Sequence, residues 1–206
     1  MFYYCVITGC GLSPAGIVGG SEVTPYSLPW QVALVSRGGN RPFCGGTLIS
    51  PTHVLTAAHC TGSSTFDIIV GEHTISSSSD GTRHTICRAV RHSNYNSNSL
   101  NNDFSIVHLN QPVAIGTRAV PACLPSDGDS NLEGDALAGE QLTVSGWGTL
   151  SAGGSQPDVL HSVNVPAITN LQCQQAYGSS SITNQMVCAG NVNAGGIDSC
   201  QGDSGG

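Results

Sequence analysis

Residues 198–206 read DSCQGDSGG, and this stretch decides how the whole chain is interpreted. Ser204 lies between Asp203 and Gly205, and the glycines around it allow a sharp turn that exposes the serine hydroxyl. Backbone N–H groups in such a turn can face a developing oxyanion. A serine hydroxyl is a weak nucleophile unless a base takes its proton. The stretch therefore predicts a nucleophilic serine, and it requires a histidine and an orienting group elsewhere in the chain.

A histidine and an aspartate, both nearer the N-terminus, meet this requirement. His59 stands in the sequence TAAHC. Asp103 follows the polar run NSNSLNN and precedes the apolar FSIV, so it lies where a loop enters a strand, a suitable place for a partly buried carboxylate. Taken singly, each has an ordinary alternative, since most histidines are surface or core residues and most such aspartates are caps or turn residues.

Composition and spacing favour an all-β chain. Only 9% of the 206 residues are charged, and Gly is abundant, which favours short strands joined by turns over long helices. A segment marked by prolines, residues 112–125, is the best candidate for a linker, and a Thr169 cap supports a helical turn at residues 170–177. Short apolar runs bounded by turn residues predict a sandwich or a barrel. These runs cover residues 30–35, 46–49, 66–70, 104–109, 142–145 and 159–165.

Charge and cysteine content exclude several classes of function. The net charge is -7 and lysine is absent, which argues against a nucleic-acid groove, because such a groove needs a basic stripe. No apolar stretch is long enough to span a bilayer, so no membrane partner is expected. The 9 cysteines indicate an oxidising compartment, and no pair of them has the spacing of zinc ligands. An odd number leaves at least one cysteine without a partner in the chain.

The order His59, Asp103, Ser204, each within its local sequence, resembles the trypsin and chymotrypsin family of serine proteases. The resemblance runs from Ile17 to Gly206. It implies two antiparallel Greek-key β-barrels, one over residues 17–118 and one over residues 119–206, preceded by a signal remnant or pro-segment at residues 1–16. The motifs that carry it are IVGG at Ile17, LPWQVAL at Leu28, CGGTLIS at Cys44, LTAAHC at Leu55, YNSNSLNND ending at Asp103, SGWGTL at Ser145 and DSCQGDSGG at Asp198.

The resemblance also implies a role for each site residue. Ser204 would be the nucleophile, His59 the general base and later the general acid, and Asp103 the group that holds the imidazole tautomer. The N–H groups of Gly202 and Ser204 would form the oxyanion hole. Asp198 matches the base of the primary specificity pocket, where a carboxylate would select substrates with Arg or Lys before the cleaved bond.

Activation and disulfides are likewise expected from the family. Cleavage before Ile17 would free an α-amino group that pairs with the buried Asp203 and orders the pocket, so the chain would be made as a zymogen. Cys200 has no partner in the chain, and Cys5 and Cys87 have no family role that we recognise. The expected disulfides are Cys44 with Cys60, Cys173 with Cys188, and Cys10 with Cys123.

Three features depart from the family pattern. Residue 16 is Gly, where trypsin-like zymogens usually carry Arg or Lys. The calcium loop of trypsins would begin at Glu72, but the following SSSSDG offers few carboxylates, so no metal and no other cofactor are expected. The given sequence stops at Gly206, two residues after Ser204, so the second barrel is expected to be incomplete.

These observations predict a secreted, extracellular serine endopeptidase that cuts after Arg or Lys through an acyl-enzyme. Its partners would be protein or peptide substrates and protein inhibitors of proteases, and it would act as a monomer. The alternative is a protease-like protein that binds partners without cleaving them, or an inactive fragment of the protease.

Overall fold

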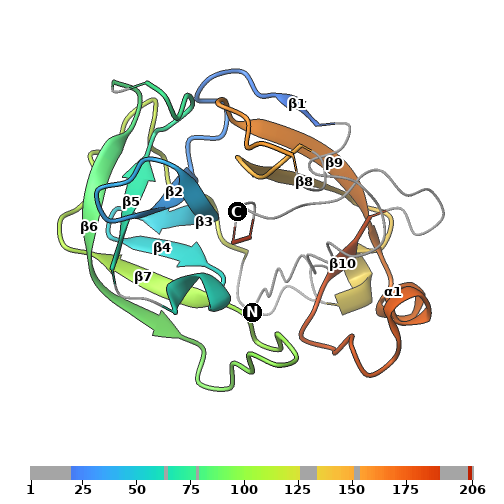
Figure 1. The fold of residues 1–206 in the computed structure, drawn as a ribbon. Coiled ribbons are helices and arrows are strands. Elements are labelled where there is room, and N and C mark those ends of the chain that lie inside the picture. Colours follow the sequence, from blue (N-terminus) through green and yellow to red (C-terminus); the bar gives the residue numbers. More distant parts are fainter. Residues whose placement is uncertain are drawn as a thin grey trace.

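The computed structural model describes residues 20–62, 65–77, 79–125, 134–150, 154–190 and 204–205. Strands dominate the described part of the chain, which confirms the prediction of an all-β fold (Figure 1). Among the described residues, no helix combines the length and the apolar composition that a bilayer crossing requires. The elements are β1 (Ser21–Glu22), β2 (Gln31–Ser36), β3 (Pro42–Ser50), β4 (His53–Thr56), the 3-10 helix η1 (His59–Thr61), β5 (Phe66–Val70), β6 (Thr82–Arg91), β7 (Ser105–Leu109), the 3-10 helix η3 (Gly134–Leu137), β8 (Gln141–Gly146), β9 (His161–Ile168), α1 (Asn170–Tyr177) and β10 (Cys188–Ala189).

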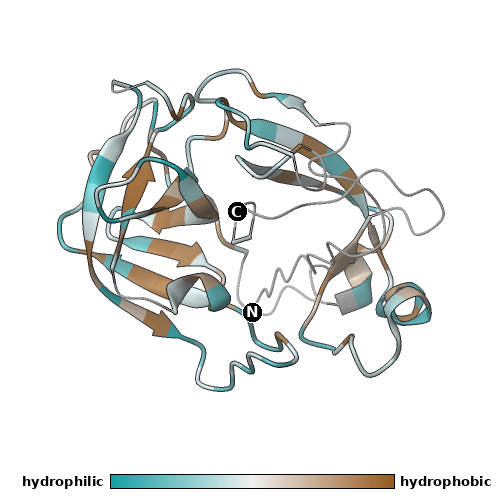
Figure 2. Ribbon diagram, in the orientation of Figure 1, coloured by the Kyte–Doolittle hydropathy of each residue, from teal (hydrophilic) through white to brown (hydrophobic). Residues whose placement is uncertain are grey.

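The first half of the chain forms a closed barrel. Its strands follow the order β2-β3-β4-β7-β6-β5, and every neighbouring pair is antiparallel. Closure leaves no free strand edge in this part of the fold. The barrel interior is filled by apolar side chains, and Figure 2 shows hydrophobic residues, coloured brown, along the strands of the barrel. This core consists of Val32, Leu34, Cys44, Leu48, Val54, Ala57, Cys60, Phe66, Ile68, Val70, Val107, Leu109, Val113 and Ala119.

The second half of the chain forms a four-stranded sheet. Within it, β9 pairs with β1, β10 and β8, and all three pairings are antiparallel. Strand β1 begins the first predicted domain, yet it lies at the edge of this second sheet. Helix α1 is capped by Thr169, whose side chain accepts from the Gln172 N–H while the Gln172 side chain accepts from the Thr169 N–H.

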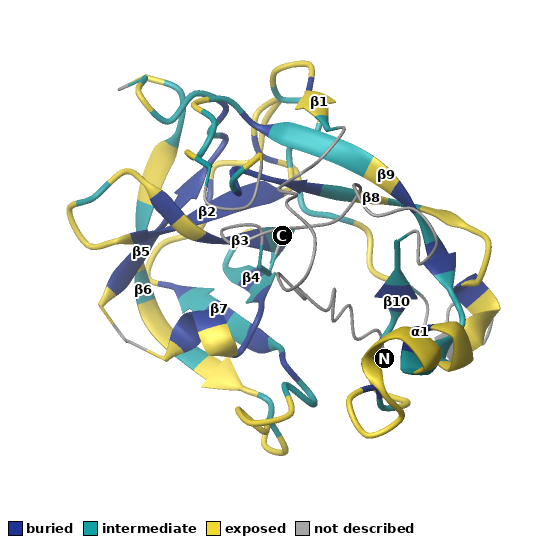
Figure 3. Ribbon diagram, turned by 45° about the vertical axis from the view of Figure 1, so that its right-hand side comes forward, coloured by how far each residue is buried: buried dark blue, intermediate teal, exposed yellow. Residues whose placement is uncertain are grey.

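The strands β2 and β5 are buried on both faces, as Figure 3 shows by their dark blue colour. Side chains alternate along a strand, so Val32 and Leu34 enter the barrel interior while Ala33 and Val35 point outward. The outward residues pack in a second core that includes Trp147 and Leu160 from the second half of the chain. The second sheet therefore rests on the outer face of the barrel at β2 and β5.

Two buried hydrogen bonds fix this contact. Trp147 Nε1 donates to the His73 carbonyl at 3.1 Å, and Ser145 Oγ donates to Gln31 Oε1 at 2.7 Å. The polar atoms of both bonds are buried, so a shift of β8 against the barrel would leave them without partners at a cost in free energy. The two bonds therefore fix the position of β8 as well as contributing stability.

We expect replacement of Trp147 by alanine to lower the free energy of unfolding by about 3–5 kcal/mol, because it empties the centre of the second core and leaves the His73 carbonyl without its donor. Urea unfolding followed by circular dichroism measures the change. Trp30→Ala is the matched control, since Trp30 is 37% exposed whereas Trp147 is 1% exposed. Equal losses for the two tryptophans would contradict the role given to Trp147.

Candidate active site

His59 and Asp103 are brought together by the pairing of β4 with β7. In that pair Thr56 lies opposite Ser105, so the residues that follow β4 and those that precede β7 meet at the same end of the barrel. His59 opens η1 three residues after β4 ends, and Asp103 lies two residues before β7 begins. The two residues are therefore placed by the strand register, although they are far apart in the chain.

The Asp103 carboxylate holds His59 through both of its oxygens. The His59 Nδ1 and Asp103 Oδ2 atoms lie 2.6 Å apart, and the His59 backbone N–H donates to Asp103 Oδ1 at 2.9 Å. The Asp103 side chain is 4% exposed, whereas that of His59 is 35% exposed. A carboxylate that accepts from Nδ1 fixes the tautomer in which Nε2 carries the lone pair. The ring is thus a base that a substrate can reach.

A pair of buried hydroxyl groups, those of Thr61 and Ser105, joins η1 to β7. The Thr61 Oγ1 and Ser105 Oγ atoms are 3.2 Å apart, and Thr61 Oγ1 also accepts from Arg91 Nε at 3.3 Å. Ser105 is completely buried. These contacts connect η1 to the first residue of β7, so they hold the segments that carry His59 and Asp103 in fixed relation.

The disulfide Cys44–Cys60 lies beside His59 and joins β3 to η1. It is one of the pairings implied by the resemblance, and Cys173–Cys188, which joins α1 to β10, is another. Closing a short loop of this kind stabilises the folded protein by about 3 kcal/mol.

The sulfur atoms of Cys44 and Cys60 and a ring nitrogen of His59 lie within 4.8 Å of one another. Both cysteines are oxidised, so they offer no thiolate to a metal ion.

Ser204 and Gly205 dock against the barrel at this same end, where the red end of the chain lies beside β3 in Figure 1. The Ser204 carbonyl accepts from the Gly45 N–H at 2.9 Å, and Cys60 Sγ lies 3.5 Å from the same oxygen. In the described part of the chain no hydrogen bond joins the Ser204 hydroxyl to His59. Catalytic contacts of this kind often tighten only when substrate binds.

Gly205 is required by this docking. Its φ of +86° is a conformation that other residues rarely adopt, and a Cβ atom there would collide with Thr56 Oγ1 and lie 2.7 Å from the Gly45 carbonyl oxygen. Thr56 Oγ1 in turn donates to that carbonyl at 2.7 Å. Gly45 and Thr56 thus form the surface on which the Ser204 turn docks. Sequence reasoning missed them, although both lie inside the motifs CGGTLIS and LTAAHC.

Comparison with known proteins gives this arrangement its context. A family model described as Trypsin matches residues 17–206. Trypsin from Xenopus laevis is 40% identical over 207 residues, which cover 98% of this chain and 79% of that protein. Trypsin I-P1 from Gallus gallus is 42% identical over 193 residues, covering 92% of this chain and 72% of that protein. Serine protease 1 from Rattus norvegicus is 41% identical over 192 residues, which cover 92% of this chain and 73% of that protein.

The chain belongs to the trypsin family. It is a trypsin-like serine endopeptidase, as the resemblance predicted. The described residues of this trypsin-family chain include His59, Asp103 and Ser204. Several other predicted site residues lie outside the described part of the chain, namely Ile17, Asp198, Gly202 and Asp203. Cys123 is an exposed free cysteine, and its predicted partner Cys10 lies outside the described residues, so this pairing stays a prediction.

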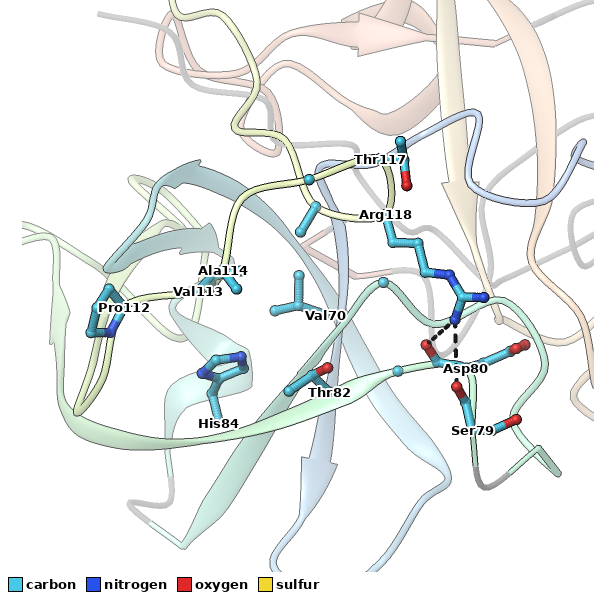
Figure 4. Close-up of a pocket in the computed structure, with 14 residues that line it drawn as sticks. Val70, Ser79, Asp80, Thr82, His84, Pro112, Val113, Ala114, Thr117 and Arg118 are labelled. Atoms are coloured by element: carbon cyan, nitrogen blue, oxygen red, sulfur yellow. Dashed lines mark hydrogen bonds between the residues drawn. The ribbon is translucent and has the colours of Figure 1, made fainter.

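The loop where trypsins hold calcium begins at Glu72, and its described residues do not fit such a site. Glu72 Oε1 is buried without a hydrogen-bond partner. Both oxygens of Asp80 are already engaged, by the Tyr26 hydroxyl at 3.0 Å and by the Thr74 N–H at 3.0 Å. Calcium needs six to eight oxygen ligands, and among the described residues of this loop only Glu72 has a carboxylate oxygen that accepts no hydrogen bond. Arg118 closes the loop instead, donating to the carbonyls of Ser79 and Asp80 (Figure 4).

The electrostatic state of Glu72 follows from its burial and from the neighbouring charge of Asp80. Burial raises its pKa from 4.5 to about 7, and the negative charge of Asp80 adds to the shift. A raised carboxyl pKa means that the folded state resists ionisation. Below pH 4.5 the group is neutral in both folded and unfolded chains, and above pH 7 the fold bears the full cost of the charge.

We therefore expect Glu72→Gln to stabilise the protein at pH 8 by about 1 kcal/mol, or about 2–4 °C in Tm, a value reduced to allow for solvent screening. The gain should shrink as the pH falls from 7 and vanish near 4.5. Thermal unfolding at several pH values measures it, with the exposed Glu140→Gln as control. A gain that is constant with pH would show that ionisation of Glu72 is not its cause.

Proposed function

We propose that this protein is a secreted endopeptidase that cleaves peptide bonds after Arg or Lys through an acyl-enzyme on Ser204. The observation that carries the proposal is the His59–Asp103 pair, with 2.6 Å between Nδ1 and Oδ2, at the barrel end where the Ser204 turn docks. Only a base held in this tautomer and open to substrate can take the proton of a serine hydroxyl at neutral pH.

The chemistry follows from these positions. His59 Nε2 takes the proton of the Ser204 hydroxyl as Oγ attacks the carbonyl carbon, and the N–H groups of Gly202 and Ser204 hold the resulting oxyanion. The tetrahedral intermediate collapses when the imidazolium gives its proton to the leaving amine. Water then attacks the acyl-enzyme as it loses a proton to His59, and His59 returns that proton to Ser204 Oγ when the bond between Oγ and the acyl carbon breaks and the acid product leaves. Asp103 stays ionised throughout and stabilises the imidazolium.

Specificity for basic residues rests on Asp198. It lies six residues before Ser204, at the position that forms the base of the specificity pocket in trypsins. A poorly solvated carboxylate there would be paired by an incoming guanidinium or ammonium group. The chain itself contains six arginines and no lysine, which fits a protease that avoids its own cleavage sites.

Activation would depend on a new N-terminus. In this proposal, cleavage before Ile17 frees an α-amino group that pairs with Asp203 and orders the oxyanion hole and pocket. Gly16 before the cleaved bond differs from the basic residue of trypsin-like zymogens, so the activating enzyme would recognise other features. The disulfides Cys44–Cys60 and Cys173–Cys188 support secretion, because such bonds persist in oxidising compartments.

The experiment compares protein that begins at Met1 with protein that begins at Ile17, using fluorogenic peptides that carry Arg, Lys or Phe before the cleaved bond. Cleavage of the Arg and Lys peptides by the second form alone supports the proposal. Ser204→Ala is the control that shows the activity to be the protein's own. Binding of protein inhibitors without hydrolysis by either form would instead favour a protease-like binding protein.

A further inference from the structure

A hydrogen bond joins the loop before Asp103 to the second half of the chain. Thr183 Oγ1 donates to Asn101 Oδ1 at 2.6 Å, and the bond is partly shielded from solvent. Asn101 lies two residues before Asp103, whereas Thr183 lies between α1 and β10 (Figure 1). The segment that carries the Asp103 carboxylate is therefore tied to the half of the molecule that does not contain it.

Thr183 is held from its own side by helix α1. Asn170 Nδ2 donates to the Thr183 carbonyl at 3.2 Å, and Gln174 Nε2 donates to the Ile182 carbonyl at 3.2 Å. Ile182 is buried in a cluster with the disulfide that joins α1 to β10. The backbone that carries the Thr183 hydroxyl is therefore anchored both by packing and by hydrogen bonds.

The loop on the other side of this bond is strained. Leu100 and Asn102, which flank Asn101, have φ values of +54° and +55°. Asparagine adopts this left-handed conformation fairly often, but leucine rarely does. Such a conformation persists only where the surrounding structure imposes it. The Thr183 hydroxyl holds the residue between the two and so supplies a restraint of this kind.

The same short segment sets the direction of the Asp103 side chain. The Phe104 N–H donates to the Asn102 carbonyl at 2.9 Å, which makes a three-residue turn centred on Asp103. The Asn102 side chain donates to the Asn94 carbonyl at 3.1 Å. If residues 100–102 relaxed, the Asp103 carboxylate would move away from His59 Nδ1, which now lies 2.6 Å from it. A displacement of about 1 Å at a catalytic group can lower the rate by up to about 100-fold.

We propose that Thr183 is a positioning residue for catalysis. Its hydroxyl holds Asn101, and through Asn101 it keeps the strained loop in the conformation in which Asp103 orients His59. The loop would then have two states, one in which Asp103 is in place and one in which the strain is released, and the bond from Thr183 favours the first. This inference rests on the proposed roles of His59 and Asp103.

The test replaces Thr183 with valine, which keeps the shape of the side chain and removes the hydroxyl. We expect kcat on an Arg peptide to fall about threefold to fivefold, because losing one neutral hydrogen bond changes the ratio of the strained to the relaxed loop by about fivefold. KM should stay unchanged, since the substrate side chain is held at Asp198 and not by Asp103. Thr183→Ser keeps the hydroxyl and should keep kcat within about twofold of the unaltered enzyme.

Thr143→Val is the matched control. Thr143 Oγ1 donates to Asn164 Oδ1 at 2.8 Å, so it makes the same kind of bond, but between β8 and β9, which carry none of the residues given a catalytic role. Its kcat should equal that of the unaltered enzyme. If Thr183→Val lost no more activity than Thr143→Val, or if Thr183→Ser lost as much as Thr183→Val, the inference would be overturned while the proposed function stood.

Asn101→Ala tests the same bond from its other end, and it decides the matter if Thr183→Val fails to fold. It should lower kcat by a similar factor with KM unchanged, whereas Asn164→Ala, its control, should not. A kcat unaffected by Asn101→Ala would overturn the inference. All variants are measured in the protein that begins at Ile17, and absence of cleavage by the unaltered form would instead count against the proposed function and, with it, this inference.

Discussion

Replacing Asp103 with asparagine is expected to lower kcat about 10⁴-fold without unfolding the protein. Asparagine can still accept from the His59 backbone N–H, which now bonds to Asp103 Oδ1 at 2.9 Å. Its amide group, however, would donate to Nδ1 where the carboxylate accepts. The imidazole would then carry its proton on Nε2, which could no longer take a proton from Ser204.

Steady-state kinetics on an Arg peptide, with circular dichroism for the fold, checks this result. Asp158→Asn is the matched control, because the Asp158 carboxylate also accepts a backbone N–H, that of Ser76, at a site away from His59. Its kcat should stay within a small factor of the unaltered enzyme. If the two variants were equally active, the role proposed for Asp103 would be wrong.

The second large effect is expected at the specificity pocket. Asp198→Ser should lower kcat/KM for an Arg peptide about 10³-fold, because the guanidinium of the substrate would be buried without a partner, a loss of about 3–5 kcal/mol. Hydrolysis of a Phe peptide should change little, since that side chain has no charge to pair. The ratio of the two rate constants is therefore the informative quantity.

The control for net charge is Glu140→Ser, which removes one exposed carboxylate far from Ser204 in the chain. It should leave the ratio of Arg to Phe hydrolysis unchanged. An unaltered protein that cleaved Arg and Phe peptides at equal rates would contradict the proposed specificity, even if it were an active protease.

Strongly patterned segments were predictable from sequence. The apolar run at residues 66–70 became β5, and the Thr169 cap marked the start of α1. His59 and Asp103 were found because each lies within a distinctive local sequence, and the register of β4 with β7 then explains why they meet. These features depend on a few neighbouring residues, which is the information that a sequence pattern contains.

Other features depend on contacts that no local pattern records. Strand β6 was missed because most of its residues are exposed and its register shifts between Ile86 and Arg88, so its apolar residues do not alternate regularly. The pairing of β1 with β9 joins residues about 140 positions apart, at Ser21 and Ser162. The docking of the Ser204 turn on Gly45 was also missed, because it depends on tertiary packing rather than on local secondary-structure propensity.

The strands β2 and β5 are buried on both faces, and this determines how the protein unfolds. Ala33 and Val35 on one face and Val32 and Leu34 on the other belong to separate cores, yet the same backbone carries them. Neither half of the molecule can unfold alone without exposing apolar surface of the other half to water. Calorimetry should therefore give one cooperative transition, with equal calorimetric and van't Hoff enthalpies, rather than a separate transition for each sheet.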